Sequence, residues 1–307
     1  MLNADEMPCY FQGRYVPLKD ANINIRTHAM QYGTAVFGGI RGYWNAEKKN
    51  LYVFRLHDHW QRLRQSGKIM QMHWQMEFEE FEQIVLKILR DGNWQCNVYL
   101  RPVIYKNALE LSPRLHNVTD DFSVYAIPLN DYLDTRNGLK VCVSSWTRIS
   151  DNQIPTRAKA TGGYINSALA KSEAIQNGFD EAIFLDVHGN VSEGSAENLF
   201  IVRNGKLITA TVTDSILEGI TRRSILEIAQ NLGIVVIERP ISRTELYVAD
   251  EAFFSGTGVQ VAWISSVDRR TIGSGTIGAL TEKLQNTFFK IVTGEDAAYS
   301  KWQTSVY

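Results

Sequence analysis

The chain of 307 residues has almost no net charge, few cysteines and no long apolar run. Its 32 basic and 33 acidic residues leave a formal net charge of −1, so no basic field is present to attract nucleic acid or anionic lipid. No stretch reaches the roughly 18 apolar residues that a membrane-spanning helix needs. The first residues, MLNADEMPCYFQG, are partly acidic and lack the apolar centre of a secretion signal. We therefore expect a cytoplasmic protein that binds neither nucleic acid nor membranes.

The three cysteines, Cys9, Cys96 and Cys142, are odd in number and far apart in the chain. Their spacing fits neither a disulfide framework nor a zinc site, and we expect no metal. Buried, reduced thiols are the simplest interpretation, and they are usual for cysteines in the cytoplasm.

Short strands, helices and hairpin turns alternate along the chain, which favours an α+β fold over a parallel doubly wound sheet. The clearest hairpin has Gln12-Gly13 at its turn. An amphipathic helix is predicted within residues 77–93, with Phe81, Val85 and Ile88 on one face and Gly92 at its end. Other predicted elements are strands at 97–105 and 140–146, a helix at 165–176 closed by Asn177-Gly178, an antiparallel meander over 181–209 and a final helix at 278–292.

The domain organisation is predicted from a change in composition near residue 128. Pro128 is followed by mainly polar residues and then by Gly138, which is typical of a linker. We predict a small N-terminal domain at 1–128, an inter-domain loop at 129–137 and a large C-terminal domain at 138–307. With 44% hydrophobic residues, the chain has enough apolar material for sizeable cores.

Two residues are candidates for chemistry on an aromatic cofactor. Lys159 lies in RAKATGGY, where the Gly162-Gly163 pair leaves room for a bulky group near its amine. A lysine that forms a Schiff base must be neutral, which desolvation or a nearby cation achieves; most lysines, however, are solvated surface residues. Glu193, in VSEGSAENLF, is a carboxylate that would keep a facing pyridine nitrogen protonated, although acidic residues are also common in turns.

Two small-residue segments and one arginine are candidates for binding an anion. Gly219, Ile220 and Thr221 precede an amphipathic helix, so their N–H groups would point off its N-terminus. Residues 255–258, Ser-Gly-Thr-Gly, follow a strand and would offer further N–H donors. Arg55, at the start of a helix, would supply a guanidinium to the same anion, such as a phosphate. An ordinary helix start, a tight turn and a surface arginine would give the same patterns, so these features do not by themselves name a reaction.

Taken together and in order, seven segments resemble the branched-chain aminotransferases, which are class IV enzymes of fold type IV. The resemblance runs from about Gly13 to Gly294. The segments are HAMQYGTAVFGGIRGY, VFRLHDHWQRL, NVYLRPVIY, IPTRAKATGGYINS, VSEGSAENLFIV, LEGITRRSI and ADEAFFSGTG. The resemblance implies an α+β fold with two α/β-type domains and an active site between them. It also implies pyridoxal 5'-phosphate as the cofactor, and a homodimer or homohexamer.

The resemblance also assigns roles to the matching positions. Lys159 would be the Schiff-base lysine and catalytic base, Glu193 would hold the pyridine nitrogen, and Tyr164 would bond the ring hydroxyl oxygen. The cofactor phosphate would be held by Arg55, Gly219, Ile220, Thr221, Gly256 and Thr257. The substrate would contact Tyr32, Phe37, Arg41, Tyr99, Arg101, Thr257 and Gly258, with Arg101 on the distal carboxylate of glutamate. Tyr32 would line the pocket from its own or from a neighbouring subunit.

The implied activity is transamination of L-leucine, L-isoleucine and L-valine with 2-oxoglutarate, by a ping-pong mechanism, in amino-acid biosynthesis. The chain departs from the family's usual pattern at Gly38, where the family usually has Glu, at Leu129, where an aromatic residue is common, and at Gly258, where Ala is common. A D-amino-acid or (R)-amine transaminase or an aminodeoxychorismate lyase of the same fold, or a non-catalytic relative, therefore remain alternatives. D-amino-acid transaminases and the lyases usually end the substrate strand with an Arg-Gly pair, so the sequence Tyr-Leu-Arg-Pro-Val at 99–103 favours the branched-chain type.

Overall fold

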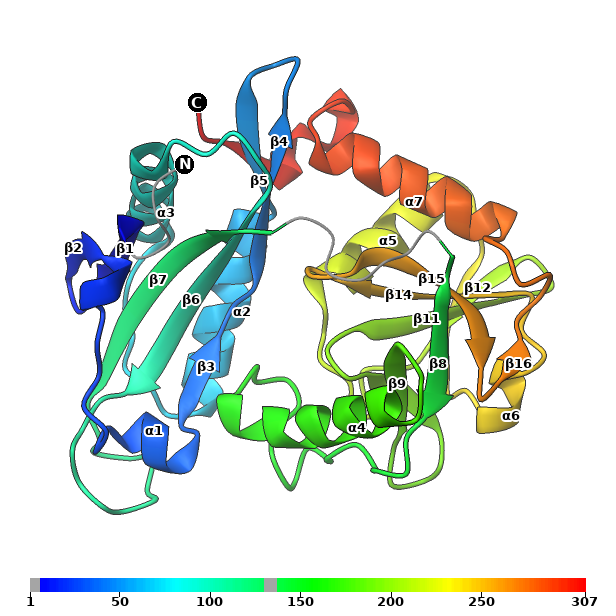
Figure 1. The fold of residues 1–307 in the computed structure, drawn as a ribbon, viewed down its shortest axis with the longest axis horizontal. Coiled ribbons are helices and arrows are strands. Elements are labelled where there is room, and N and C mark those ends of the chain that lie inside the picture. Colours follow the sequence, from blue (N-terminus) through cyan, green and yellow to red (C-terminus); the bar gives the residue numbers. More distant parts are fainter. Residues whose placement is uncertain (1–5, 130–136) are drawn as a thin grey trace. The chain divides into compact units, whose positions relative to one another are not determined.

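The computed structural model describes residues 6–129 and 137–307, which divide into two compact units (Figure 1). Within the described residues, unit 1 comprises 6–129, 158–162 and 290–307, and unit 2 comprises 137–157 and 163–289. Residues 130–136 of the predicted inter-domain loop lie outside the described residues. The domain boundaries given above stay a prediction.

Unit 1 is built on one antiparallel sheet of eight strands, in the order β17-β5-β4-β6-β7-β1-β2, with β3 paired to β6. Its β1–β2 hairpin confirms the predicted turn. Gln12 and Gly13 both have positive φ, at 51° and 80°, as the tightest hairpin turns require. The strands are β1 (Pro8–Phe11), β2 (Arg14–Pro17), β3 (Ala35–Phe37), β4 (Ile40–Asn45), β5 (Asn50–Phe54), β6 (Val98–Lys106), β7 (Asp120–Pro128) and β17 (Gln303–Ser305).

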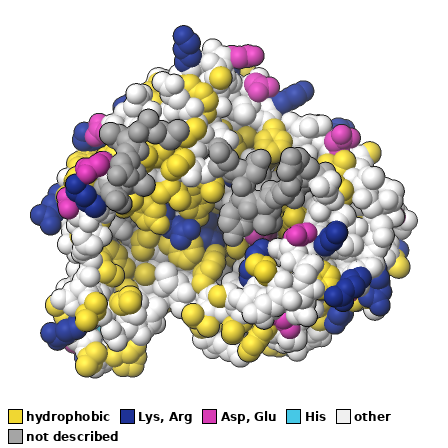
Figure 2. Space-filling view, viewed as in Figure 1, with side chains coloured by type: hydrophobic (Ala, Val, Ile, Leu, Met, Phe, Trp, Pro, Cys, Tyr) yellow, Lys and Arg dark blue, Asp and Glu magenta, His cyan; other side chains and the backbone are white. Residues whose placement is uncertain are grey.

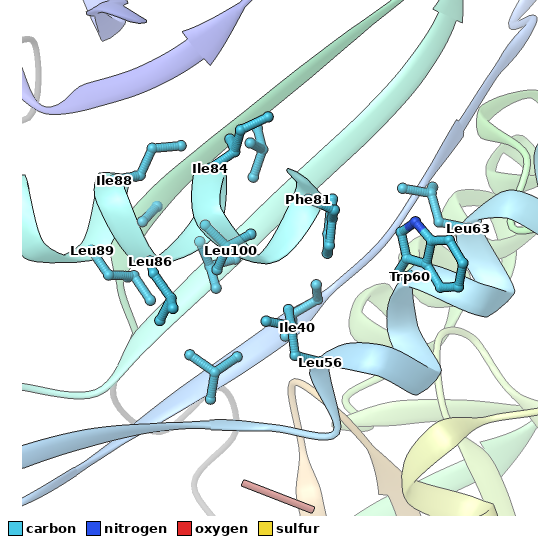
Figure 3. Close-up of a cluster of buried hydrophobic side chains, with 14 of the residues drawn as sticks. Ile40, Leu56, Trp60, Leu63, Phe81, Ile84, Leu86, Ile88, Leu89 and Leu100 are labelled. Carbon is cyan, nitrogen blue, oxygen red and sulfur yellow. The ribbon is translucent and has the colours of Figure 1, made fainter. Parts of the chain in front are cut away.

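The main core of unit 1 lies between this sheet and two helices, α2 (Leu56–Ile69) and α3 (Phe78–Gly92). Figure 3 shows side chains of both helices, including Trp60 and Phe81, gathered with Ile40 and Leu100 of the strands. Helix α3 is amphipathic as predicted and ends at Gly92; the next residue adopts the left-handed conformation that commonly closes a helix. The shorter helices of the unit are η2 (Leu18–Asp20), α1 (His28–Tyr32) and η4 (Ala297–Trp302).

Unit 2 is built on a mixed sheet of nine strands, in the order β10-β9-β8-β15-β14-β11-β12-β13, with β16 paired to β15. Strand β10 pairs with both β9 and β11, so six of the strands close into a ring. The predicted meander is confirmed as the antiparallel run from β9 to β12. The strands are β8 (Leu139–Val143), β9 (Glu181–Leu185), β10 (Val191–Gly194), β11 (Asn198–Arg203), β12 (Lys206–Thr209), β13 (Val236–Glu238), β14 (Glu251–Gly256), β15 (Gln260–Val267) and β16 (Arg270–Thr271).

Strand β8 is shorter than predicted, since it ends at Val143 rather than at residue 146. The cause is the Glu173 carboxylate, which accepts hydrogen bonds from the Ser144 hydroxyl at 2.5 Å and the Ser145 N–H at 3.0 Å. The Ser144 N–H still donates to the Ile183 carbonyl at 2.9 Å, so the carboxylate takes the place of the ladder at Ser145.

The helices of unit 2 confirm the one predicted at 165–176, since α4 ends at Gln176, and the amphipathic helix expected next to residues 219–221, which is α5 and ends at Asn231. Apolar side chains of α4 pack with Cys142 and Phe184 of the sheet, and a second, larger core consists mainly of side chains from the strands of the ring. The helices are η3 (Thr161–Gly163), which begins in unit 1, α4 (Tyr164–Gln176), α5 (Ile220–Asn231), α6 (Arg243–Leu246) and α7 (Ala279–Val292), which begins in unit 2 and ends in unit 1. In the described part of the chain, no helix is long and apolar enough to cross a membrane.

Candidate active site

Lys159 belongs to a five-residue segment, 158–162, that is held by strand β3 of unit 1. The Phe37 N–H donates to the Lys159 carbonyl at 3.0 Å, and Val36 forms an isolated antiparallel bridge with Ala160. The Lys159 N–H donates to the hydroxyl of the buried Ser66 on α2, at 3.2 Å. The neighbours Ala158 and Ala160 are buried in the core of unit 1. The backbone of the lysine is therefore fixed on both sides, so its amine starts from a defined position.

The Lys159 amine lies in a cluster with Phe37, Arg101 and Tyr99. The amine is 5.2 Å from the centroid of the Phe37 ring, and the Arg101 guanidinium carbon is 4.5 Å from the same centroid. The Arg101 Nη2 donates to the Tyr99 hydroxyl at 3.1 Å. Strand pairing explains the grouping: Phe37 lies opposite Val103 of β6, the strand that carries Tyr99 and Arg101. The pattern of β6 places these two side chains on the same face.

Of the two other substrate residues predicted in unit 1, Arg41 lies close to this cluster and Tyr32 does not. Arg41 is opposite Tyr99 in the β4–β6 register, is 1% exposed, and donates to the Leu129 carbonyl at 3.1 Å. A Cβ at Gly39 would collide with the Tyr99 hydroxyl, so only glycine at position 39 allows the hydroxyl to stay where it is. Tyr32 is exposed on α1, where its ring packs against that of His28 at 4.8 Å, and no contact joins it to the cluster in the described residues.

Arg55 is the residue from which α2 starts, as predicted. It is 9% exposed and has the left-handed backbone conformation, with φ 49°. Its Nε donates to the Asp58 carboxylate at 2.6 Å, and its guanidinium carbon lies 4.3 Å from the centroid of the Trp302 ring. An arginine in this setting is positioned rather than freely solvated.

Glu193, on β10, is buried in unit 2 among three hydrogen-bond donors. Its Oε1 accepts from Arg148 Nη2 at 2.8 Å, and its Oε2 accepts from Asn198 Nδ2 and the Leu217 N–H, each at 3.0 Å. Donors of this kind stabilise the charged form of a carboxylate. Asn198 also donates to the Leu217 carbonyl at 2.9 Å, so one amide joins the acid to the turn that leads into α5.

The predicted anion-binding residues 219–221 were placed before a helix, and this detail is wrong. Gly219 is the N-cap of α5, and Ile220 and Thr221 are its first two residues. The N–H groups of a first helical turn have no partner within the helix, and the helix dipole favours an anion there. The corrected position therefore suits a phosphate.

The turn after β14 is the second candidate site for an anion. Strand β14 pairs with β11, which pairs with the strand that carries Glu193. Gly256 ends β14 opposite Gln260, with Thr257 and Gly258 in the turn between them. Ser255 pairs with Asn198, which in turn pairs with Glu193. The Ser255 hydroxyl is buried and has no hydrogen-bond partner among the described residues. Tyr164, the first residue of α4, is half-buried in the same unit.

A second buried acid, Glu197, lies four residues beyond Glu193. It is 4% exposed, and its Oε2 accepts the Ala196 N–H at 3.0 Å. Burial raises the pKa of Glu197 to about 8, and the carboxylates of Glu181 and Glu193 also raise it. This side chain is therefore largely protonated at neutral pH.

Sequence reasoning missed Arg148 and Asn198, although both hold Glu193. Asn198 lies inside a quoted motif, and an amide at the start of a buried strand was the available signal. Arg148 is far from Glu193 in sequence, and only the fold brings them together. No group of three His, Cys, Asp or Glu side chains in the described residues is arranged to hold a metal ion. A hollow of about 840 Å³ beside α2, lined by residues that include Trp60, Arg64 and Trp74, contains none of the predicted site residues.

Comparisons with known proteins identify relatives that match most of the chain. Residues 35–267 match the family model for amino-transferase class IV. A protein of Aquifex aeolicus described as a "probable branched-chain-amino-acid aminotransferase" is 44% identical over 299 residues, covering 97% of this chain and 96% of that protein. A crystal structure of the branched-chain aminotransferase of Thermoproteus uzoniensis with norvaline has a TM-score of 0.94 and 41% identity, covering 98% of this chain and 99% of that one. The enzyme of Thermobaculum terrenum, in its pyridoxal-phosphate form, has a TM-score of 0.94 and 37% identity, covering 99% and 100%.

The chain belongs to the class IV aminotransferase family. The predicted family and the predicted fold-type IV, α+β architecture are both confirmed. The roles assigned to single residues remain predictions.

Proposed function

We propose that this protein uses pyridoxal 5'-phosphate to transfer amino groups between the branched-chain L-amino acids leucine, isoleucine and valine and 2-oxoglutarate. The cluster of Lys159, Phe37, Arg101 and Tyr99 carries the proposal, because it joins an amine, an apolar ring and a guanidinium in one place. The relatives named above support the same reaction, since they are named branched-chain aminotransferases.

A branched-chain aminotransferase must accept both an apolar side chain and the carboxylate of glutamate. The Phe37 ring offers apolar surface to the first, which gains free energy as its area leaves water. Arg101 offers a charge-assisted hydrogen bond to the second. The Nε of Arg101 is buried and has no partner in the described part of the chain, so the guanidinium retains donor capacity.

The residues present fit pyridoxal phosphate. A lysine with a fixed backbone, a buried carboxylate, a helix N-terminus and a glycine turn with an unpaired buried hydroxyl are the donors and acceptors that the group requires. Glu193 would hold the pyridine nitrogen and Tyr164 the ring hydroxyl. The N–H groups of Ile220 and Thr221, the turn at 256–258 and Arg55 would hold the phosphate.

When bound, pyridoxal phosphate supplies a carbonyl carbon that receives the amino group and a ring that withdraws electrons from Cα. The Lys159 amine removes the Cα proton and later returns a proton, as a general base and acid. Arg148 and Asn198 hold the Glu193 carboxylate in place, and Glu193 would stabilise a protonated ring nitrogen. Tyr99 and the backbone of Thr257 and Gly258 would orient the α-carboxylate of the substrate.

The test mixes the purified holoprotein with L-leucine and, separately, with D-alanine, and follows the visible absorption of the bound cofactor. We expect L-leucine to bleach the band and 2-oxoglutarate to restore it, because the amino group is held on the cofactor between the two half-reactions. Bleaching by D-alanine alone would assign the chain to the D-amino-acid transaminases. Bleaching by an (R)-amine alone would make it an amine transaminase. Pyruvate formed from aminodeoxychorismate without an acceptor would make it a lyase.

The role of Arg101 has its own test. Replacing Arg101 with Ala should lower kcat/KM for L-glutamate by roughly tenfold to a hundredfold more than for L-leucine, because a charge-assisted hydrogen bond of about 1.5–3 kcal/mol is lost for glutamate only. Single-turnover rates for the two amino acids measure this ratio. Equal losses would show that Arg101 supports the pocket without recognising the distal carboxylate.

We also propose that the enzyme is a cytoplasmic homodimer or homohexamer. Unit 1 exposes a group of apolar side chains at α1 and in two loops beside it, and Figure 2 shows hydrophobic side chains at the surface in this region. The two loops are tied together, since Arg26 donates to the Leu109 carbonyl at 2.9 Å. The group, Ile23, Ile25, Met30, Tyr32, Leu109 and Leu111, is 37–78% exposed. Clustered exposed apolar residues of this kind mark contact surfaces, and sedimentation velocity measures the assembly.

A further inference from the structure

The end of the chain is docked onto strand β5, about 250 residues earlier in the sequence. Strand β17 pairs with β5, with Gln303 opposite Phe54 and Ser305 opposite Tyr52. Val306 is fully buried, and its N–H donates to the Leu51 carbonyl at 3.0 Å. Strand β17 is therefore the edge strand of the unit 1 sheet, and η4, the first part of the terminal segment 297–307, leads directly into it.

This segment delivers Trp302 to Arg55, the first residue after β5. The Arg55 N–H donates to the Trp302 carbonyl at 2.6 Å, and the guanidinium carbon stands 4.3 Å from the centroid of the Trp302 ring. The ring is itself held by edge contacts with Phe54 at 5.8 Å and a tilted contact with Tyr299 at 4.6 Å. Arg55 is thus held through its backbone and through the plane of its side chain.

Arg55 needs this support because its conformation is unfavourable in isolation. A non-glycine residue with φ 49° occupies the left-handed region, which is sterically unfavourable for a residue with a Cβ. An unrestrained arginine also loses side-chain conformational entropy when it is fixed. Contacts that hold the residue in place before a ligand arrives remove much of this cost from binding.

We propose that Trp302, in the C-terminal segment 297–307, is a positioning residue. It fixes the Arg55 side chain in the orientation that binds the phosphate of the cofactor. The inference rests on the proposed function, because it takes Arg55 as a phosphate ligand. Trp302 acts through Arg55. Its loss therefore weakens the binding of ligands that carry a phosphate and leaves the binding of the same ring without a phosphate unchanged.

The test compares the dissociation constants of pyridoxal phosphate and pyridoxal for the apoprotein, by absorbance titration. Trp302→Leu keeps apolar bulk beside Phe54 but removes the aromatic face, whereas Trp302→Phe keeps a face. We expect Trp302→Leu to weaken pyridoxal-phosphate binding by roughly five- to thirtyfold, which is the range of a partly buried cation–π contact. We expect no change for pyridoxal, and substantial recovery in Trp302→Phe.

Tyr307→Ala is the matched control, because the Tyr307 hydroxyl donates to the Trp94 carbonyl at 3.2 Å and anchors the same segment away from Arg55. Equal effects of Trp302→Leu and Tyr307→Ala would overturn the proposal, since both would then act through segment docking. A parallel loss for pyridoxal, or equal affinities in the Leu and Phe variants, would overturn it as well.

Arg55→Ala separates this inference from the proposed function. We expect it to lower the affinity for pyridoxal phosphate relative to pyridoxal, and we expect Trp302→Leu to add no further loss in that background. If Arg55→Ala leaves the ratio of affinities unchanged, the phosphate role of Arg55 fails. If Arg55→Ala lowers the ratio and Trp302→Leu does not, the phosphate role stands and the positioning role of Trp302 fails.

Discussion

Replacing Glu197 with Gln should change how the stability of unit 2 depends on pH. Burial is the first cause that raises the pKa of Glu197 from 4.5 to about 8, and the Glu181 carboxylate is the second. The Lys171 ammonium, 2.6 Å from Glu181, acts in the opposite direction, and Glu193 adds to the increase. In the folded protein the side chain therefore keeps its proton across a pH range in which the unfolded chain has lost it.

The sign and size follow from proton linkage. Between pH 4.5 and about 8 the folded state binds more protons at this site than the unfolded state, so stability falls as pH rises. The slope is about 1.4 kcal/mol per pH unit, which gives a loss of about 2 kcal/mol from pH 6 to pH 8. Gln carries no titrating proton, so Glu197→Gln should lose this component of the slope. A change of 2 kcal/mol corresponds to roughly 4–8 °C in Tm for a domain of 150–250 residues.

Calorimetry of the apoprotein from pH 5.5 to 8.5 measures the difference in Tm between the wild type and Glu197→Gln. The Tm of the variant should rise relative to that of the wild type as pH increases to about 8. Above pH 8 the difference in Tm should become constant. Glu282→Gln is the control, because it makes the same substitution at an exposed carboxylate on α7 that burial does not protonate. A Tm difference that stays constant with pH in Glu197→Gln would refute the reasoning, because Glu197 would then be ionised in the fold.

Two further predictions concern the surroundings of the site. Arg148→Met removes the ionic partner of the buried Glu193 carboxylate, so urea denaturation should show unit 2 destabilised by about 3–5 kcal/mol, with part of the loss recovered in Arg148→Lys. An unchanged midpoint would mean that the neutral donors suffice. Gly38→Ala places a Cβ 2.7 Å from Pro102 Cγ, and this overpacking should cost about 1–3 kcal/mol in thermal melts. A neutral result would show that the Pro102 ring moves aside, which would make room for larger residues at 38.

Local signals in the sequence predicted much of the fold because they act over short distances. The hairpin at Gln12-Gly13 and the end of the helix at Gly92 depend on neighbouring residues only. The C-terminal strand β17 was not predicted, since residues 303–305 become a strand through pairing with β5. A segment of three residues is too short to show the alternation of apolar and polar side chains that predicts a strand.

The site residues also fall into two groups, those that the sequence identified and those that only the fold brings into place. Lys159 and Glu193 were identified from motifs and from a resemblance, and each lies in a fixed, hydrogen-bonded setting. Their supporting residues were not identified, because Arg148 and Trp302 reach Glu193 and Arg55 only through the fold. Such contacts depend on how segments that are distant in the sequence pack together, and local sequence does not encode this.

The distribution of the chain between the two units has a consequence for synthesis on the ribosome. Unit 1 begins with the first strands but includes residues 158–162, which carry the lysine, and residues 290–307, which contain the last strand. Unit 2 is complete in the sequence by residue 289. The unit that begins first is therefore finished last, and an incomplete nascent chain exposes the edge of β5 until residues 303–305 can pair with it. Gene fragments that end near residue 129 would lack two segments of unit 1, so the units cannot be separated by one cut or exchanged as simple modules.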